Sequence, residues 1–207
     1  MIFKPDEINT NDTTNKSLDS NNFDKRLEHN DLTENAKDNT KQNFDERISG
    51  EDKEQIETKE LFDLFYNGWD KLSIDNKKDA CDALFKEVAS ELNLNERPEL
   101  VYKDLVDKDY GEYDFDNNLL LINNQYLNNG VETLKTIIHE LRHAWQYQRA
   151  ELPTSDQTVF DKLLSTNIDC YINPEDNYLA YFIQPMEMDA YKYTEAFIGK
   201  MGGEFSE

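Results

Sequence analysis

The sequence predicts an α+β fold in which helices flank a small antiparallel sheet. Three observations lead to this prediction. Apolar residues recur every three or four positions from about residue 58 to 92, strand-like patterns follow between 99 and 123, and helical spacing returns from 131 onward. Helices, then strands, then helices again are typical of an α+β domain with a segregated sheet.

Two helices are expected before the strands. From about Thr58 the large apolar residues share helical spacing: Leu61, Leu64, Phe65, Trp69 and Leu72. Ser73 is suited to cap the N-terminus of a second helix, which would run to about Leu92. Pro98 then ends the helical pattern.

The strands are short and close together. Leu100–Tyr102 fits one strand, and Gly111–Phe115 and Leu119–Ile122 fit two more on either side of the turn signal Asp116-Asn-Asn118. The last two are therefore predicted to form an antiparallel hairpin.

The second half of the chain is predicted to be mostly helical. An apolar stripe predicts a helix from Val131 to about Arg149, which Pro153 prevents from continuing. Three more helices are expected, at about 156–166, at about 175–183, and from Pro185 to Gly202-Gly203.

Composition divides the chain near residue 55. Residues 1–55 are rich in Asn, Asp, Thr, Lys and Glu, and they hold too little apolar surface to offset the entropy of ordering. We expect this acidic, polar segment to be disordered and residues 56–207 to form a single domain. Two similar stretches in the segment, Asn22–Leu27 and Asn43–Ile48, are candidate docking motifs for a protein partner.

Charge excludes one class of partner. The net charge is −22, and residues 56–207 contribute −16 of it, from 30 acidic and 14 basic residues. Because phosphate binding requires a basic face, a nucleic-acid partner is not expected, whereas a basic protein partner or substrate would fit.

The remaining composition indicates a soluble chain. No apolar run approaches the ~20 residues that span a membrane, and no signal peptide is visible. We expect synthesis in the cytoplasm, and any export would have to use a route that needs no such signal. Two cysteines, Cys81 and Cys170, are too few and too far apart for a disulfide framework or a thiolate cluster.

The sequence His139-Glu-Leu-Arg-His143 lies within the helix predicted from Val131. Residues four apart share a helix face, so both imidazoles can reach one zinc ion at ~2.0–2.1 Å. Glu140 is turned by ~100° from His139, which suits a general base acting on a water held by the metal. Arg142 projects away from the histidine face and is expected to pair with an acid on a neighbouring helix.

A catalytic zinc ion needs one more protein ligand and an open position for water. No histidine follows His143, so the third ligand must be a carboxylate. Glu187 is favoured, because it lies in the first turn of the helix predicted from Pro185, where a buried carboxylate is costly without a metal or a partner. Asp189 is the alternative. The acid that is not a ligand would hydrogen-bond a ligand histidine or Arg142.

These residues resemble the gluzincin clan of zinc metallopeptidases, in which His-Glu-x-x-His is followed by a Glu on a later helix. The resemblance rests on "TIIHELRHAWQYQ", "YFIQPMEMDA" and "GEYDFDNNLLLINNQYL", and extends to small metallopeptidase domains of phage proteins and bacterial polymorphic toxins. It covers about residues 98–200. It implies a zincin-like active-site helix, zinc held by His139, His143 and Glu187, Glu140 as the base, and a protein or peptide substrate.

Two further site features are predicted. A tyrosine could stabilise the oxyanion, and Tyr181 is preferred over the other candidates, Tyr147, Tyr178, Tyr191 and Tyr193. By analogy with zincins, the free edge of the strand Leu119–Ile122 is expected to align an extended peptide. Two alternative functions remain at this point, a catalytically inactive zinc-binding module and a toxin-type protease with one narrow target.

Overall fold

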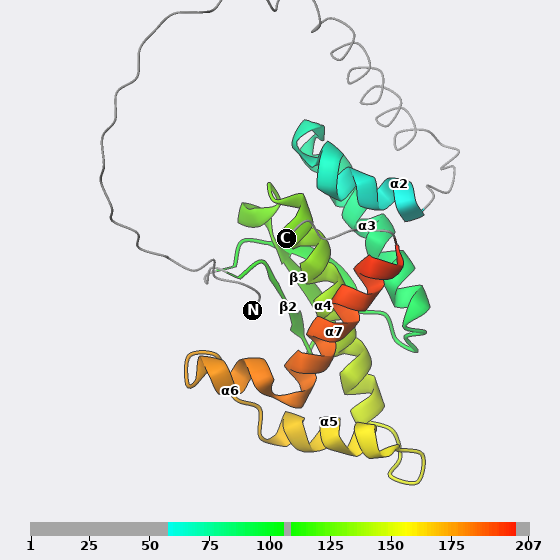
Figure 1. Ribbon diagram of the computed structural model, residues 1–207, viewed down its shortest axis with the longest axis vertical. Coiled ribbons are helices and arrows are strands. Elements are labelled where there is room, and N and C mark those ends of the chain that lie inside the picture. Colours follow the sequence, from blue (N-terminus) through cyan, green and yellow to red (C-terminus); the bar gives the residue numbers. More distant parts are fainter. Residues whose placement is uncertain (1–57, 106–108, 202–207) are drawn as a thin grey trace, which may run out of the picture.

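The computed structural model describes residues 58–105 and 109–201 (Figure 1). In this part of the chain, six α-helices and three strands follow one another in the predicted order of helices, strands and helices. The elements are α2 (Thr58–Asp63), α3 (Ile74–Glu91), β1 (Glu99–Lys103), β2 (Gly111–Asp114), β3 (Leu119–Asn123), α4 (Gly130–Ala150), α5 (Val159–Asp169), α6 (Tyr178–Ile183) and α7 (Pro185–Lys200). The α+β prediction is confirmed. The predicted boundary at residue 55, both docking motifs and Gly202-Gly203 lie outside the described residues.

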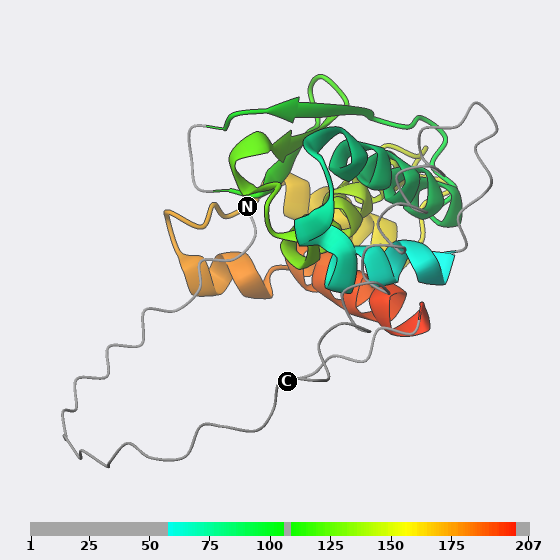
Figure 2. The same ribbon diagram turned by 90° about the horizontal axis from the view of Figure 1, so that it is seen from above.

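Helix α4 is the centre of the fold. Its stripe of Leu134, Ile137, Ile138, Leu141 and Ala144 is fully buried. Helix α4 lies between the sheet on one side and α7 on the other, with α3 packed alongside (Figures 1 and 2). Its opposite face can therefore present side chains toward α7.

Short polar residues set where several helices begin. The Ser73 hydroxyl accepts a hydrogen bond from the Asn76 N–H, which confirms the predicted cap of α3. Helix α5 begins at Val159 rather than at about 156, because Thr158 and Asp161 form a capping box that holds its first turn. The Asn177 side chain accepts a hydrogen bond from the Ala180 N–H and caps α6, so that helix begins at Tyr178 instead of about 175.

The sheet is mixed, with strand order β1-β3-β2. The predicted hairpin is confirmed, since β2 and β3 are antiparallel with Gly111 opposite Ile122. Strand β1, however, pairs parallel with β3, with Glu99 opposite Leu119, so the prediction of a purely antiparallel sheet was wrong.

The prediction that Leu119–Ile122 has a free edge was also wrong. Strand β3 lies between the other two, and Leu120, Leu121 and Ile122 are buried. Both edges of β3 are therefore paired, which leaves β1 and β2 at the edges of the described sheet. Any extended peptide would have to pair with one of those strands.

No helix in the described ranges combines the length and apolarity that a membrane crossing requires.

Candidate metal centre

Helix α4 brings the two histidines of the His-Glu-x-x-His sequence together on the face turned toward α7. His139 and His143 are one turn apart, and their Nε2 atoms are 3.0 Å from each other. Both imidazoles are largely shielded from solvent. This is the shared helix face that the spacing of four predicted.

Helix α7 supplies the third group. Glu187 lies in its first turn, two residues after Pro185, and its side chain is 0% exposed. Its Oε2 lies 3.2 Å from His139 Nε2, and its Oε1 lies 3.4 Å from His143 Nε2. Among the described residues, these three form the group of His, Cys, Asp and Glu side chains that could hold a metal ion.

The spacing of these atoms fits a metal site. Around a tetrahedral ion with bonds of about 2.0–2.1 Å, ligand atoms lie about 3.3 Å apart. The two histidine nitrogens are 3.0 Å apart, and the distances from them to the two Glu187 oxygens, 3.2 Å to Oε2 and 3.4 Å to Oε1, are also close to that value. Two imidazole nitrogens and one carboxylate oxygen are also a donor set found in catalytic zinc sites.

The two histidines and the carboxylate shift one another's pKa values. Burial lowers the pKa of His139. Burial has the same tendency at His143, but the Glu187 carboxylate outweighs it and raises the pKa of His143 to about 9. Burial of Glu187 is outweighed in turn by the two histidines, which hold the pKa of its carboxyl well below the usual range. Metal binding must therefore displace a proton from this cluster.

Two tyrosines hold the Glu187 carboxylate from the side of α6. Tyr171 Oη donates to Oε1 at 2.5 Å, and Tyr181 Oη donates to Oε2 at 2.9 Å. The structure thus brings Tyr181 into the site, with its hydroxyl directed at a candidate ligand. Its role as an oxyanion donor stays a prediction. Tyr171 was not among the predicted residues.

A polar clamp fixes the segment that carries Tyr171. Gln184 Oε1 accepts from Ile172 N at 3.1 Å while Gln184 Nε2 donates to Ile172 O at 3.1 Å. Asn167 donates to the same Gln184 oxygen and accepts from the N–H of Met186, beside Glu187. The end of α5 and the start of α7 are therefore held together around the carboxylate.

Asp189 has a different partner. Its carboxylate accepts two hydrogen bonds from Arg142, from Nε at 2.8 Å and from Nη2 at 3.2 Å. The guanidinium also lies over the rings of Trp145, 3.7 Å from the centroid, and Tyr193, at 4.7 Å. The prediction that Arg142 pairs with an acid on a neighbouring helix is confirmed, and the acid is Asp189.

Gln146 was missed by the sequence analysis. It is buried, and its Oε1 lies 2.8 Å from His143 Nδ1. Its Nε2 donates to Met186 O at 2.9 Å and to Asp189 Oδ2 at 2.8 Å. Its position three residues after His143, on the same helix face, was the available signal.

The side chain of Glu140, the predicted base, extends from α4 to strand β2. It is buried, and its Oε2 accepts a hydrogen bond from the Tyr113 N–H at 3.0 Å. Gly111 permits this approach, because a Cβ at that position would meet Leu121 O and, at 2.8 Å, Thr136 Cγ2 on α4. The carboxylate is thereby held at the edge of the sheet, beside the two histidines.

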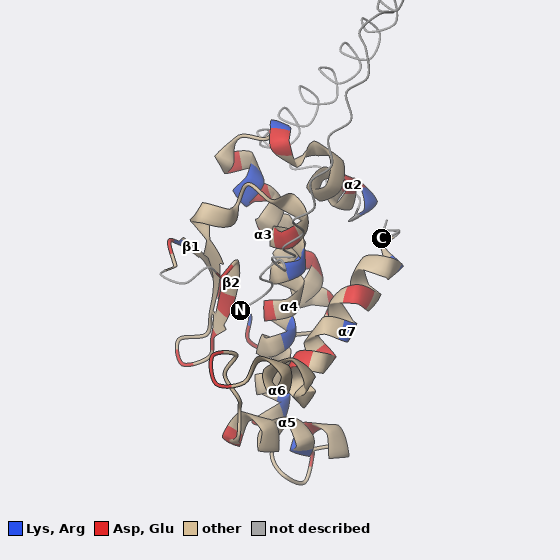
Figure 3. Cartoon of the chain, turned by 60° about the vertical axis from the view of Figure 1, so that its left-hand side comes forward, with Lys and Arg blue, Asp and Glu red and all other residues tan. Residues whose placement is uncertain are grey.

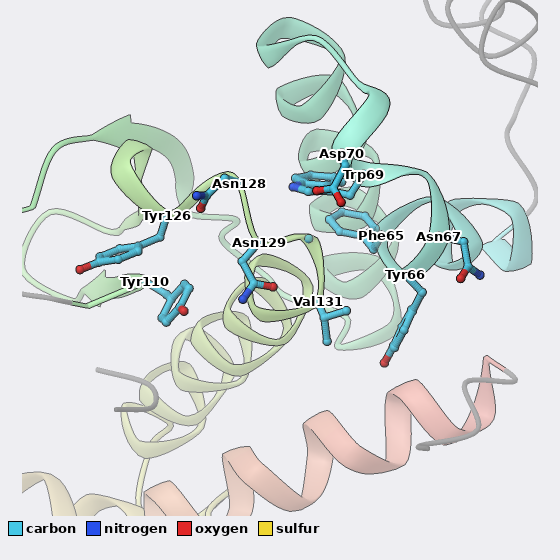
Figure 4. Close-up of a pocket in the computed structure, with 11 residues that line it drawn as sticks. Phe65, Tyr66, Asn67, Trp69, Asp70, Tyr110, Tyr126, Asn128, Asn129 and Val131 are labelled. Carbon is cyan, nitrogen blue, oxygen red and sulfur yellow. The ribbon is translucent and has the colours of Figure 1, made fainter. Parts of the chain in front are cut away.

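A separate hollow lies at the start of α4 (Figure 4). It has a volume of about 520 Å³ and contains no residue of the histidine cluster. The residues around it are mainly aromatic or amide-bearing: Phe65, Tyr66, Asn67, Trp69, Asp70, Tyr110, Tyr126, Asn128, Asn129, Gly130 and Val131. Gly130 sits against the Trp69 ring, where a Cβ would collide with the ring and with the Phe65 carbonyl.

Strand β2 and helices α3 and α7 each carry more acidic than basic residues. Figure 3 shows acidic residues on β2, α3 and α7, with fewer basic residues among them. This distribution agrees with the net charge of −22.

Comparison with known proteins gives one match. No curated protein and no solved structure matches the chain. A family model described as "Putative metallopeptidase family (DUF6782)" matches residues 76–166. The matched segment contains His139, Glu140 and His143 and ends before α7, so Glu187 lies beyond it. The match supports a metallopeptidase-like domain built around α4.

Proposed function

We propose that this chain is a zinc-dependent metallopeptidase of the gluzincin type. The observation that carries the proposal is the convergence of His139, His143 and Glu187 at separations of 3.0–3.4 Å, with Glu140 on the same helix. Two nitrogens and a carboxylate leave a fourth position for water, which is the arrangement of hydrolytic zinc sites. The family match points to the same class of chemistry.

Zinc, when bound, would lower the pKa of water toward ~7 and polarise the scissile carbonyl. The Glu140 carboxylate would take the proton of the attacking water and deliver it to the leaving amine. Its hydrogen bond from the Tyr113 N–H would orient one oxygen and leave the carboxylate fixed during the transfer. Tyr181 is the proposed donor to the oxyanion, and to fill this role its hydroxyl, which donates to Glu187 Oε2, would have to turn from that carboxylate toward the substrate.

Strand β2 is the proposed guide for the substrate. It lies at an edge of the described sheet, and its Tyr113 contacts Glu140. An extended peptide added along this edge would pass the base directly. The acidic surface favours substrates with basic segments near the cleaved bond.

Metal analysis combined with peptide cleavage tests the proposal. The wild-type chain should hold about one zinc per molecule and cleave unstructured protein substrates. Glu140→Gln should keep the zinc and lose cleavage by a factor of at least ~10². Retention of full cleavage in Glu140→Gln would show that the base is elsewhere.

The third ligand is tested by a matched pair on α7. Glu187→Ala should lose zinc at micromolar free metal, whereas Asp189→Ala should retain measurable binding because its side chain contacts Arg142 and Gln146 rather than the histidines. Loss of zinc in Asp189→Ala alone would contradict the assignment. Zinc binding by the wild type with no cleavage in a proteome-wide digest would instead indicate a zinc-binding module.

A further inference from the structure

Gln146 connects the two helices that carry the candidate ligands. It projects from α4, three residues after His143, and is 0% exposed. On one side it contacts a ligand histidine, and on the other it contacts the residues that flank Glu187 on α7, namely Met186 and Asp189. One side chain thus touches the surroundings of both ligands.

The orientation of the Gln146 amide follows from its partners. Its nitrogen faces two groups that can only accept, the Met186 carbonyl and the Asp189 carboxylate. Turning the amide over would place an oxygen against both of them. The Oε1 atom must therefore face His143 Nδ1, at 2.8 Å.

This orientation determines the state of the His143 ring. Because Gln146 Oε1 can only accept, His143 Nδ1 must carry the hydrogen. In the neutral ring, Nε2 then carries the lone pair, and Nε2 is the atom directed at Glu187 and His139. The hydrogen bond selects the tautomer that can bind a metal at the cluster.

Asp189, which accepts a hydrogen bond from the Gln146 amide, is itself held in place. Asp189 receives Gln146 Nε2 and Arg142 Nε on the same oxygen, Oδ2. Arg142 is itself held over the rings of Trp145 and Tyr193. Asp189 is therefore fixed by a planar group that has little freedom to move, and it fixes the Gln146 amide in turn.

We propose that Gln146 is a positioning residue for the metal centre: it holds His143 in the Nε2-binding tautomer and sets the spacing between α4 and the Glu187-bearing turn of α7. The inference rests on the proposed zinc site, but it does not require the protein to be an active peptidase. Arg142, through Asp189, is the support that keeps the Gln146 amide in this orientation.

The test compares zinc affinity, measured by competition with a chelator, in the full chain and three variants. Gln146→Ala removes every contact, and Gln146→Glu keeps an acceptor for His143 but places a carboxylate against Asp189 and the Met186 carbonyl. Gln148→Ala is the matched control, since Gln148 is on the same helix and bonds only to the backbone at Asn95 and Glu96. Zinc affinity should fall roughly 10- to 100-fold in both Gln146 variants and change less than about threefold in the control.

A spectroscopic readout separates positioning from a general loss of structure. In the zinc-loaded wild type, the His143 Nδ1–H should give a proton NMR signal protected from exchange with water. Only three histidines occur in the chain, which simplifies its assignment. In zinc-loaded Gln146→Ala the signal should broaden or disappear, while the amide spectrum of the rest of the domain stays folded.

The outcomes distinguish this inference from the proposed function. Equal zinc affinity in wild type and Gln146→Ala, or an unchanged Nδ1–H signal, would overturn the role of Gln146 even if the protein cleaves peptides. Weakened affinity with loss of the signal supports that role even if the wild type cleaves nothing, a result that would reject the peptidase proposal alone.

Discussion

The ion pair between Asp161 and Arg149 should make stability depend on pH in a defined way. Asp161 lies in the first turn of α5 and is 1% exposed, and its two oxygens accept from Arg149 Nε at 2.8 Å and Nη2 at 2.6 Å. The hydroxyl and the N–H of Thr158 also donate to it. Chiefly because of the Arg149 hydrogen bonds, the pKa of Asp161 is lowered from 3.8 to about 2.

The sign and size of the effect follow from this shift. A carboxyl whose pKa is lower in the folded state stabilises the fold above its unfolded pKa, and the stabilisation is lost as pH falls through the folded value. The shift to about 2 corresponds to roughly 2 kcal/mol at pH 7, after a discount for screening because Arg149 is 33% exposed. About half of that should remain at pH 3.

The contribution of Asp161 to the free energy of unfolding can be measured by urea unfolding of Asp161→Asn and wild type at pH 7, 5.5 and 3. The variant should be less stable by about 2–3 kcal/mol at pH 7. The difference should shrink by about 1 kcal/mol at pH 3, because the carboxyl of the unfolded wild-type chain takes up a proton there while the folded one stays ionised. Asp156→Asn, at an exposed site, should differ from wild type by less than ~0.5 kcal/mol throughout. A difference for Asp161→Asn that is the same at pH 7 and pH 3 would refute the electrostatic explanation.

Three further predictions concern close packing, the planar arginine and the metal. Gly130→Ala should destabilise the fold by about 1–3 kcal/mol in urea unfolding, because the new Cβ would collide with Trp69. Gly199→Ala should instead stabilise it by up to ~1 kcal/mol, because a Cβ there would meet no atom within 4 Å. Equal effects at the two glycines would argue against the steric explanation. Arg142→Lys should lower thermal stability by an amount equivalent to about 1–2 kcal/mol, since an ammonium cannot make the two-point contact with Asp189; an unchanged melting temperature would contradict it. Zinc at about 100 times its Kd should stabilise the wild type by ~2.7 kcal/mol in calorimetry, and an equal gain in Glu187→Ala would place the metal elsewhere.

The helices and the candidate metal-binding residues could be predicted because their signals are local. The spacing of His139 and His143 defines one helix face, and Ser73 marks a helix start whatever the rest of the fold does. Glu187 was favoured over Asp189 from the cost of burying a carboxylate, and the structure brings Glu187 to the histidines.

The sheet topology could not be predicted from such signals. The pairing of Glu99 with Leu119 joins residues far apart in the sequence, and nothing in either strand indicates whether its neighbour is parallel or antiparallel. The continuous apolar run of β3 did contain a hint, because a strand buried on both faces is more often central than at an edge. Applied to Leu119–Ile122, that rule would have excluded the free edge.

The residues that support the site were missed for a different reason. Gln146, Gln184 and Asn167 are polar residues on or beside amphipathic helices, where a polar residue is normally assigned to the solvent face. Their importance depends on which partner each meets after α5 and α7 pack against α4. Only Gln146 had a local signal, its position one turn after His143.

The distribution of buried polar groups argues that this region was shaped by function. In the described part of the chain, eleven polar or charged side chains are buried, and six of them belong to the candidate metal cluster or lie next to it: His139, Glu140, Gln146, Asn167, Gln184 and Glu187. Burying such groups destabilises a fold unless each finds partners, and apolar residues of similar size would pack at least as well. A fold selected for stability alone would have filled the space between α4 and α7 with residues like those on the opposite face of α4. The concentration of polar groups there is explained if they hold a cation. Binding of a metal would stabilise the folded state and offset the unfavourable free energy of burying these groups.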